Sequence, residues 1–207
     1  MNISARLKTI ASLVKDNSSI VDVGCDHGLL DIYLTKYKNV HCVASDNKAS
    51  CLNNAISNIK KYNLEDRIKT ILCDGVEGID LDTIDTVIIS GMGTDTIINI
   101  IKNKNINHMI IQSNNNLYEL RKKITNMGYM IINEVVVFEY KYYVIIEFIK
   151  ENKKYNELEL RYGPILLKNN NKEYFTYLYN KLNNIKKKNK NLPFKDKFYI
   201  WKLKKYC

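Results

Sequence analysis

Short apolar segments alternate with longer segments of helical period along the first 128 residues. In residues 4–16, apolar side chains recur at Leu7, Ile10, Ala11 and Val14, which is helical spacing. The same pattern predicts strands at 20–23, 40–45, 68–73, 85–90 and 108–112, and further helices at 29–37, 48–62, 94–102 and 117–127. Strands that alternate with helices pair in parallel, so the pattern predicts an α/β sheet.

After Gly128 the pattern changes to two β-rich runs within residues 129–149, with a polar turn at 139–141. Two such runs joined by a short turn predict an antiparallel hairpin. Five βα units that end in a hairpin resemble the layout of class I S-adenosylmethionine-dependent methyltransferases. A nicotinamide-binding Rossmann domain finishes with a parallel strand instead. For residues 1–150 we therefore expect a Rossmann-like methyltransferase domain whose mostly parallel sheet ends in an antiparallel hairpin.

Residues 151–207 predict a second, helical domain. A polar connection spans 151–170, where Gly163 and the proline after it are expected to break any helix. A helix is expected over 172–191, and another after Pro193. One face of this last helix carries aromatic side chains, namely Phe194, Phe198 and Trp201. We interpret them as the seam of an antiparallel helix pair, with direct stacking on nucleobases as the alternative.

The excess positive charge lies in this second segment. Residues 1–150 hold 17 Lys and Arg against 17 Asp and Glu, whereas residues 151–207 hold 15 against 5. Such asymmetry indicates an anionic partner, most simply nucleic acid. Biased base composition of the genome is the other explanation for a chain in which only four of 32 cationic residues are Arg. It does not explain why the first 150 residues are balanced.

Several classes of protein are not expected. No apolar run approaches the roughly 18 residues of a membrane helix, and the N-terminus lacks the pattern of a signal peptide, so we expect a cytoplasmic protein without membrane contact. The five cysteines form no C-x-x-C pair, so no metal site is expected. Cys42 and Cys73 lie in apolar runs and are interpreted as core residues. Cys25 has no base beside it in the sequence, which disfavours a nucleophile.

The sequence DVGCDHGLLDIYL, residues 22–34, lies between a predicted strand and a predicted helix. A dinucleotide fingerprint that begins at Gly24 would need glycine at residues 26 and 29, which are Asp26 and Leu29. A carboxylate beside a pyrophosphate is repulsive in a loop of low dielectric constant. The loop therefore disfavours NAD, FAD and an oxidoreductase, and no Walker motif follows it.

S-adenosylmethionine reverses this electrostatic argument, because it carries an ammonium and a sulfonium and has no phosphate. Asp22 or Asp26 can accept from the ammonium. Asp46 follows the second strand and can accept both ribose hydroxyls, and Asp74 follows the third and can accept from the adenine amino group, with Gly75 permitting close approach. Each acid alone could be a turn former or a helix cap. Acids at the ends of three successive strands favour the cofactor.

The fourth predicted strand ends in SGMGT, residues 90–94, where Gly91 and Gly93 are expected to leave a wide floor beside the sulfonium. The acidic or Asn residue followed by Pro-Pro and an aromatic, which is frequent in amino-directed methyltransferases, is absent here. An exocyclic amine needs carbonyl acceptors to orient it, whereas a ring nitrogen already has an in-plane lone pair. Alignment with the methyl group then supplies most of the acceleration.

The motifs, in order, resemble those of the bacterial tRNA (adenine-22-N1)-methyltransferases, the TrmK family. They are SARLKTIA (4–11), DVGCDHGLLDIYL (22–34), DG (74–75), SGMG (90–93), QSNNNLYELR (112–121) and EVVVFEYKYY (134–143). The resemblance implies a class I fold, a coiled-coil-like helical C-terminal domain, and transfer of a methyl group to N1 of adenine 22 of tRNA, with S-adenosylhomocysteine as product. Two positions depart from the family. Thr94 replaces the last glycine of the usual GMGG motif and is expected to narrow the floor of the pocket beside the sulfonium. Ser113 replaces the proline of the usual Q-P-N motif and is expected to hold Asn114 less firmly.

The resemblance and the loop chemistry together predict three groups of site residues. The catalytic group is Asp26, His27 and Asn114. The tRNA-binding group is Arg6, Asn114, Lys141 and Tyr143. The cofactor-binding group is Asp22, Gly24, Cys25, Asp26, Asp46, Asn47, Asp74, Gly75, Gly91, Met92 and Gly93.

Some alternatives stay open. His27 could instead cap the helix after it, and Glu134, Glu139 and Glu147 could be solvent-facing strand positions. The fold could act on another RNA, a protein or a small molecule, or could bind RNA without catalysis. A monomer or weak dimer that binds tRNA through a lysine-rich tail is expected.

Overall fold

The computed structural model describes residues 1–188 and 192–207. The chain divides into two compact units, Met1–Lys153 and Lys154–Cys207. Across the described residues, no helix combines the length and the apolar character needed to cross a membrane.

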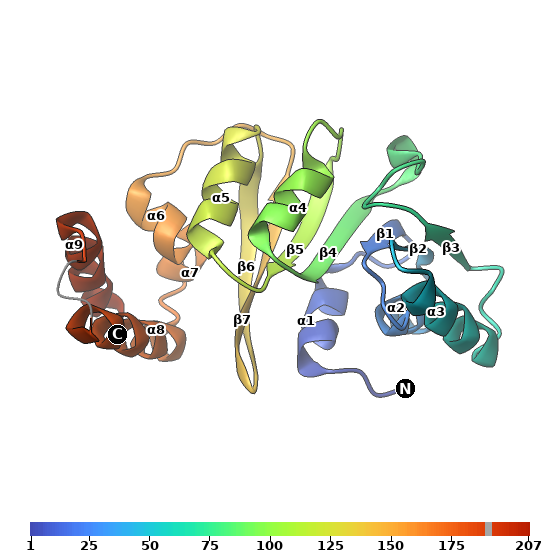
Figure 1. Cartoon of the computed structure of the whole chain (residues 1–207), viewed down its shortest axis with the longest axis horizontal. Helices are drawn as coiled ribbons and strands as arrows, with labels where there is room; N and C mark the ends of the chain where they lie inside the picture. The colour runs from blue at the N-terminus through green and yellow to red at the C-terminus, as the bar shows by residue number, and fades with distance from the viewer. Residues whose placement is uncertain (189–191) are drawn as a thin grey trace. The chain divides into compact units, whose positions relative to one another are not determined.

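The first unit contains one seven-stranded sheet with the order β3-β2-β1-β4-β5-β7-β6 (Figure 1). The strands are β1 (Ser19–Val23), β2 (His41–Asp46), β3 (Ile68–Leu72), β4 (Thr86–Met92), β5 (His108–Ser113), β6 (Met130–Glu139) and β7 (Lys141–Ile149). The helices are α1 (Ala5–Leu13), α2 (Leu29–Lys38), α3 (Ala49–Lys61), α4 (Thr94–Ile101) and α5 (Leu117–Asn126), with a short 3-10 turn, η1 (Leu81–Thr83). Strands β1 to β5 pair in parallel, and β7 pairs antiparallel with both β5 and β6. The predicted sheet, mostly parallel and ending in an antiparallel hairpin, is confirmed.

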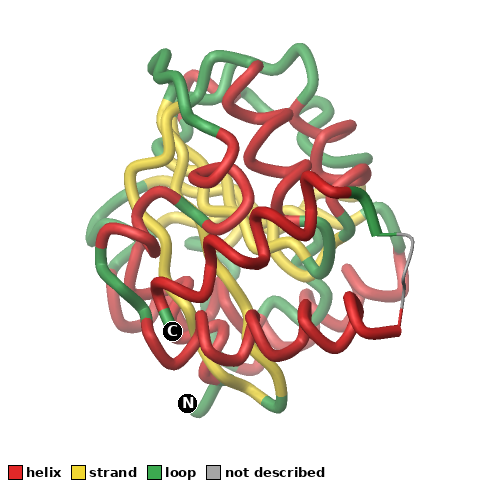
Figure 2. Tube along the Cα trace, turned by 90° about the vertical axis from the view of Figure 1, so that its left-hand side faces the viewer, coloured by secondary structure: helices red, strands yellow, loops and turns green. Residues whose placement is uncertain are grey.

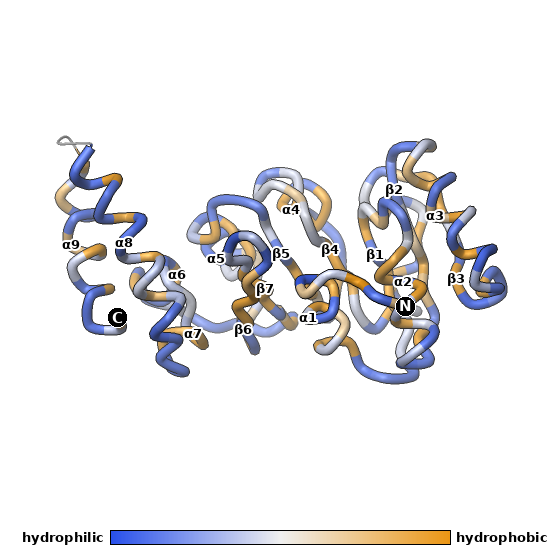
Figure 3. Tube along the Cα trace, turned by 90° about the horizontal axis from the view of Figure 1, so that it is seen from below, coloured by the Kyte–Doolittle hydropathy of each residue, from blue (hydrophilic) through white to orange (hydrophobic). Residues whose placement is uncertain are grey.

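Apolar side chains of alternate strand positions form the core on each face of the sheet. Ile20, Ile88, Ile110 and Ile145 share one buried cluster with residues of α1, α2 and α3. Figure 3 shows α1 and α4 on opposite sides of the sheet. Because helices cover both faces of the sheet, the parallel strands carry apolar side chains on both faces.

The strand order places a switch point between β1 and β4. The chain moves from β1 outward to β2 and β3 and then returns to β4 on the other side of β1. The loops that follow β1 and β4 therefore separate at the carboxyl edge of the sheet and leave a crevice, which is where ligands bind in open α/β sheets. Gly24 and Gly91 lie at these two strand ends.

Two glutamates of the hairpin are buried, which corrects the interpretation of Glu134 and Glu147 as solvent-facing positions. Glu134 accepts from Arg121 Nε at 2.7 Å, and both side chains are almost fully buried. Glu147 lies 3.3 Å from the imidazole of His108. Alternation along a strand could not reveal this, because α5 and β5 bring the partners, Arg121 and His108, from elsewhere in the sequence.

The second unit consists of helices joined by loops (Figure 2). Its elements are α6 (Glu157–Tyr162), α7 (Pro164–Lys168), α8 (Lys172–Lys188), α9 (Phe194–Leu203) and a terminal 3-10 turn, η2 (Lys204–Tyr206). The prediction that 151–170 is only a polar connection is wrong. Gly163, with φ +93°, ends α6, and Pro164 begins α7 at the first helical position, where its missing N–H is not needed. The end of the helix predicted over 172–191 falls on 189–191, outside the described residues.

The predicted aromatic seam between the last two helices is also wrong. Phe194 is 84% exposed and Trp201 is 57% exposed, whereas Ile200 and Leu203 are the buried residues of α9. On α8 the buried residues are Tyr174 and Phe175. The helices pack through a face that carries fewer aromatic rings than sequence spacing indicated.

Candidate functional site

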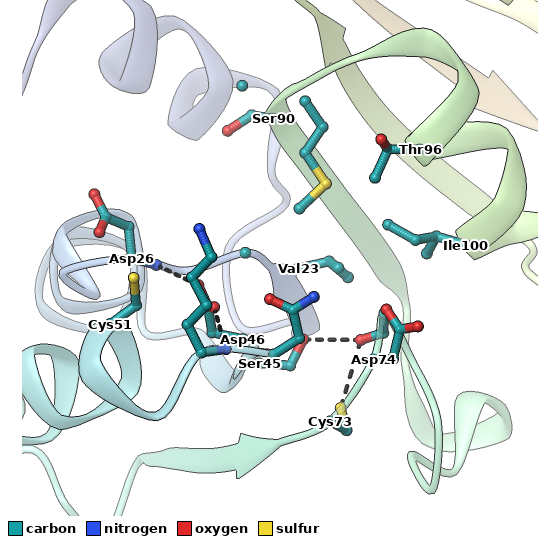
Figure 4. Close-up of a pocket in the computed structure, with 16 residues that line it drawn as sticks. Val23, Asp26, Ser45, Asp46, Cys51, Cys73, Asp74, Ser90, Thr96 and Ile100 are labelled. Atoms are coloured by element: carbon teal, nitrogen blue, oxygen red, sulfur yellow. Dashed lines mark hydrogen bonds between the residues drawn. The ribbon is translucent and has the colours of Figure 1, made fainter.

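A cavity of about 290 Å³, the strand-end cavity, lies at the carboxyl ends of β1 to β4. Eight of the residues predicted to bind the cofactor line it: Gly24, Asp26, Asp46, Asn47, Asp74, Gly75, Gly91 and Met92. Figure 4 shows Asp26 and Asp46 on one side of this cavity, and Thr96 and Ile100, from α4, on the other. The predicted acids of three different strand ends are therefore brought together around one space.

The carboxylate of Asp46 is held in place by backbone N–H groups. Its Oδ1 accepts from Lys48 N at 2.9 Å, and its Oδ2 accepts from Asp26 N at 3.3 Å. A carboxylate has about four lone-pair positions, so both oxygens keep capacity for further donors. The side chain is thus oriented in advance and can still receive a pair of hydroxyl groups from a ligand.

Gly24 allows the loop after β1 to approach β4 closely. Its φ is +76°, which favours glycine, and a Cβ at this position would collide with the Met92 methyl group. The N–H groups of Gly24 and Cys25 both donate to Ser45 O, at 2.8 and 3.0 Å. The loop is therefore tied to β2, and Asp26 is fixed next to Asp46.

A second cavity, also of about 290 Å³, lies on the other side of the loop, and we call it the Arg6 cavity. It shares Gly24, Asp26, Ser90 and Gly91 with the strand-end cavity. The other predicted site residues that line it are Arg6, Asp22, Cys25 and His27. The two spaces thus meet at Asp26 and at the end of β4.

Asp22 and Asp31 form a buried carboxyl pair beneath the loop. Asp31 is fully buried, and among the described residues no hydrogen-bond partner reaches either of its oxygens. Burial raises the pKa of Asp22 to about 7, and burial and the charge of Asp22 raise the pKa of Asp31 well above its ordinary value. Because the Asp31 side chain is the less solvated of the two, we place the proton of this pair on Asp31. Nothing in the sequence pattern distinguished Asp31, since it occupies an ordinary helical position.

Protein stability is expected to depend on this pair. Between the ordinary carboxyl pKa of the unfolded chain and the raised pKa of the folded protein, the folded protein binds more protons. The free energy of unfolding should therefore fall as pH rises from about 4 to about 7. The loss is about 1.4 kcal/mol for each unit between folded and unfolded pKa values. Urea unfolding across this range should show a shallower fall in Asp31→Asn than in the wild type. Asp16→Asn, which removes an exposed acid, is the control, and equal slopes in Asp31→Asn and the wild type would contradict the assignment.

The cysteines of this region are poor nucleophiles. Burial and, next, the charge of Asp31 raise the pKa of the Cys25 thiol far above its ordinary value. Low thiolate content argues against covalent catalysis by Cys25. Cys73, interpreted as a core residue, instead lines the strand-end cavity and is only half-buried, whereas Cys42 is buried as expected.

Asp26 and His27 lie side by side with largely exposed side chains. Asp26 adopts φ +52°, a conformation that Asp tolerates better than most residues. The His27 Nε2 atom lies 3.7 Å from Asp26 Oδ2. The helix-cap alternative for His27 is wrong, because α2 begins after Gly28 and has no side-chain cap. The His27 side chain lines the Arg6 cavity, so it can contact a ligand bound there.

A hydrogen-bond chain orients Asn114. Its Nδ2 donates to Gly91 O at 2.6 Å, and its Oδ1 accepts from Gln112 Nε2 at 3.2 Å. Gln112, fully buried, accepts at Oε1 from Arg6 Nη1 at 2.8 Å and from Gly91 N at 3.1 Å. Gln112 is thus a positioning residue that the sequence analysis missed, because its role depends on β4 and β5 being neighbours.

The two departures from the family pattern contact each other. Thr94 Oγ1 and Ser113 Oγ are 3.0 Å apart, and each lies 2.8 Å from Asn115 O. Thr94 is buried against this turn and lines neither cavity, so the expectation that it narrows the floor is wrong. Asn114 N donates to Met92 O at 2.8 Å, so the turn stays firmly held without proline. Gly93 also lines neither cavity and is the N-cap of α4.

We expect the hydroxyl pair to stabilise the turn measurably. Thr94→Val and Ser113→Ala should each lower the free energy of unfolding by about 1 kcal/mol or more, because each removes more than one hydrogen bond from a buried turn. The double variant should lose less than the sum of the single effects. Urea unfolding of the four proteins measures this coupling, and strict additivity would show that the pair does not interact.

The residues predicted to bind tRNA gather at one place beside the Arg6 cavity. The guanidinium carbon of Arg6 lies 5.5 Å from the centre of the Tyr143 ring, and Lys141 Nζ lies 4.9 Å from it. Lys141, Tyr143 and Asn114 line neither of the two cavities. Within the part of the chain that the structure describes, no cluster of three or more His, Cys, Asp or Glu side chains could hold a metal ion.

Comparisons with known proteins identify the family of this chain. A family model described as "Methyltransferase domain" matches residues 3–146. The "Putative tRNA methyltransferase MG248" of Mycoplasma genitalium is 34% identical over 172 residues, which are 78% of each chain. The tRNA (adenine(22)-N(1))-methyltransferase of Bacillus subtilis is 26% identical over 145 residues, which are 67% of this chain and 61% of that one. A solved structure of M. capricolum TrmK with S-adenosylhomocysteine is 33% identical, has a TM-score of 0.87, and covers 99% of this chain and 97% of that chain. The chain belongs to the TrmK family of S-adenosylmethionine-dependent tRNA methyltransferases.

Proposed function

We propose that the protein transfers the methyl group of S-adenosylmethionine to N1 of adenine 22 of tRNA. The observation that carries this proposal is the junction of two cavities at Asp26 and Gly91, lined by acids from three strand ends. This site suits a cationic, phosphate-free nucleoside as methyl donor. The named acceptor of the Bacillus subtilis relative supplies the position of the adenine.

The acids of the strand-end cavity fit the nucleoside part of the donor. Asp46 would accept from the two ribose hydroxyls with the lone pairs that its backbone donors leave unused. Asp74 would accept from the adenine amino group, with Gly75 leaving room for the base. S-adenosylmethionine, when bound, supplies a methyl group on a positively charged sulfur. The acidic lining would stabilise this positive charge and would repel a pyrophosphate.

The Arg6 cavity fits the amino-acid end of the donor. Asp22 and Arg6 both line it, so it offers one carboxyl group and one guanidinium to the zwitterionic amino-acid part of the cofactor. Asp22 would accept from the ammonium, and Arg6 would pair with the carboxylate. Arg6 would then serve the cofactor directly, in addition to supporting Asn114 through Gln112.

The acceptor would enter from the solvent side of Gly91 and Asn114, which are both exposed. N1 of adenine is hidden in a paired or stacked base, so the nucleotide must leave its stack. Asn114 would hydrogen-bond the Watson–Crick edge, held by Gly91 and Gln112. Methylation moves the positive charge from the sulfur to the adenine ring, and Asp26 would stabilise that charge at the junction of the cavities.

The basic second unit would hold the tRNA backbone. Its lysines would pair with phosphates without reading sequence. A tRNA substrate also supports action in the cytoplasm, where tRNA is abundant. The expectation of a monomer or weak dimer stays a prediction.

The experiment compares two unmodified transcripts of one tRNA, with adenine or guanine at position 22. Purified full-length protein and methyl-labelled S-adenosylmethionine should label only the adenine transcript, and mass spectrometry should identify N1-methyladenosine at that position. Label in both transcripts would overturn the position. Label only in protein or small molecules would overturn the tRNA substrate, and cofactor binding without any labelling would favour a non-catalytic RNA-binding protein.

A further inference from the structure

The β6–β7 hairpin extends beyond the carboxyl edge of the sheet. Strand β5 pairs with β7 only as far as Gln112, which lies opposite Ile145. The β6–β7 pairing continues for four more residue pairs, to Glu139 opposite Lys141. At about 3.3 Å per residue, the hairpin projects roughly 13 Å past the end of β5. Figure 1 shows this projection beside α1. It lies at the carboxyl edge of the parallel strands, where residues of both cavities also lie.

Aromatic rings gather at the end of this projection, in residues 138–142, which we call the hairpin tip. Phe138 is 60% exposed and Tyr140 is 98% exposed. The Phe138 and Tyr142 rings lie opposite each other on paired strands, with centroids 5.0 Å apart. Folding gains little from rings left in water, because their apolar surface stays hydrated. Their presence at the tip therefore points to a ligand that covers them.

The backbone at Tyr140 strengthens this point. Eight non-glycine residues among those the structure describes have positive φ, and seven of them are Asn or Asp. Tyr140, with φ +60°, is the exception. A bulky residue adopts this left-handed conformation less readily than Asn or Gly. The turn thus carries a large ring where Asn, abundant in this chain, would suit the backbone better, and such costs concentrate at functional positions.

Positive charge lies next to these rings. Lys141 follows Tyr140, and its Nζ lies over the Tyr143 ring. The hairpin tip is anchored to α1, since Arg6 N donates to Glu139 Oε2 at 2.8 Å. Rings interleaved with cations are typical of surfaces that bind single-stranded nucleic acid, because bases stack on the rings and phosphates pair with the cations.

From these observations we infer that the hairpin tip is a base-stacking platform for unpaired nucleotides of the tRNA that flank the target adenine. This inference rests on the proposed function. Stacking there would occupy a neighbouring base while the target adenine is withdrawn toward Asn114. The occupant is RNA, because the tip lies beside cations and overhangs the edge where the acceptor must enter.

The test uses full-length variants and binding of unmodified tRNA measured over a range of salt concentrations. Tyr140→Asn removes the ring and places a residue that suits φ +60°, so folding should be preserved. Loss of one stacked base should raise the Kd for tRNA about fivefold or more, with unchanged S-adenosylmethionine affinity and an unchanged slope of log Kd against log salt. Phe138→Thr should act in the same direction, and Tyr140→Phe should retain wild-type affinity. Lys141→Gln should instead reduce the salt slope by about one.

The matched control is Tyr37→Gln, which removes a half-exposed tyrosine from the last turn of α2, on the opposite edge of the sheet from the cavities. If the wild type methylates no tRNA, the proposed function fails. If the wild type methylates tRNA while Tyr140→Asn and Phe138→Thr bind it normally, this inference alone is overturned. A change in molecular mass by sedimentation of Tyr140→Asn, without a change in tRNA affinity, would assign the tip to a second copy of the chain and would also overturn it.

Discussion

Asp26→Asn is expected to lower kcat for tRNA methylation by about 100-fold or more. The electrostatic groups that face developing charge in an active site contribute effects of this size. Asp26 lines both cavities at their junction. In the proposed reaction it would therefore lie where the positive charge passes from the sulfur to the adenine ring. Asparagine keeps the shape of the side chain and tolerates φ +52°, so this variant removes the charge without straining the loop. Alanine would change both and would be harder to interpret.

Single-turnover methylation with saturating tRNA and S-adenosylmethionine measures this effect on the chemical step. Asp95→Asn is the matched control, since Asp95 is an exposed acid that pairs with Lys123 on the surface, where such pairs contribute little. The Kd for S-adenosylhomocysteine should change less than kcat in Asp26→Asn. A variant with wild-type kcat would remove Asp26 from the catalytic group.

Deletion of Lys154–Cys207 is expected to raise the Kd for tRNA by about 100-fold or more and to flatten its salt dependence. All the net positive charge lies beyond residue 150, and each phosphate contact that is lost reduces the salt slope by nearly one. The affinity for S-adenosylmethionine should be nearly unchanged, because every residue that lines the two cavities belongs to the first unit. Calorimetric titration with the cofactor and filter binding with tRNA measure the two affinities.

Two further variants test whether the loss of tRNA affinity comes from the positive charge of the second unit. Replacing Lys186, Lys187 and Lys188 by Gln in the full chain should give an intermediate loss, since these residues form the basic last turn of α8. Replacing Lys60 and Lys61 by Gln, in the last turn of α3 of the first unit, is the control. If deletion weakens cofactor and tRNA binding equally, the second unit has a structural role instead of an RNA-binding one.

The sheet could be predicted well because its signals are local. A short apolar run, a turn and an amphipathic helix, repeated five times, leave a parallel arrangement as the way to bury both faces of each strand. The errors arose where one residue takes part in two elements. Gly163 and Pro164 indicated a break, and the structure shows the end of α6 followed at once by the start of α7.

The aromatic spacing of α9 shows a different limit. Phe194, Phe198 and Trp201 recur at helical intervals, and such a stripe predicts a packed face. Ile200 and Leu203 are buried instead. Periodicity reveals that one side of a helix is distinct, but burial also depends on which face the neighbouring helix contacts. The same reason hid the buried role of Glu134, whose partner Arg121 comes from another element.

By itself, the sequence determined the chemical character of the cofactor loop. An acid at residue 26 disfavours pyrophosphate, and the acids after successive strands indicate a cationic nucleoside. The residues between strand and helix carry this information locally, so no contact from elsewhere is needed to interpret them. The family resemblance then supplied the acceptor.

Only the tertiary structure decided how these groups act together. It joined Arg6, Gln112 and Asn114 into one chain of hydrogen bonds, paired Asp22 with Asp31, and linked Thr94 to Ser113. It also showed that the hairpin projects beyond β5, a result of strand register. Each of these features joins residues from different elements, and such pairings arise only when the chain folds back on itself.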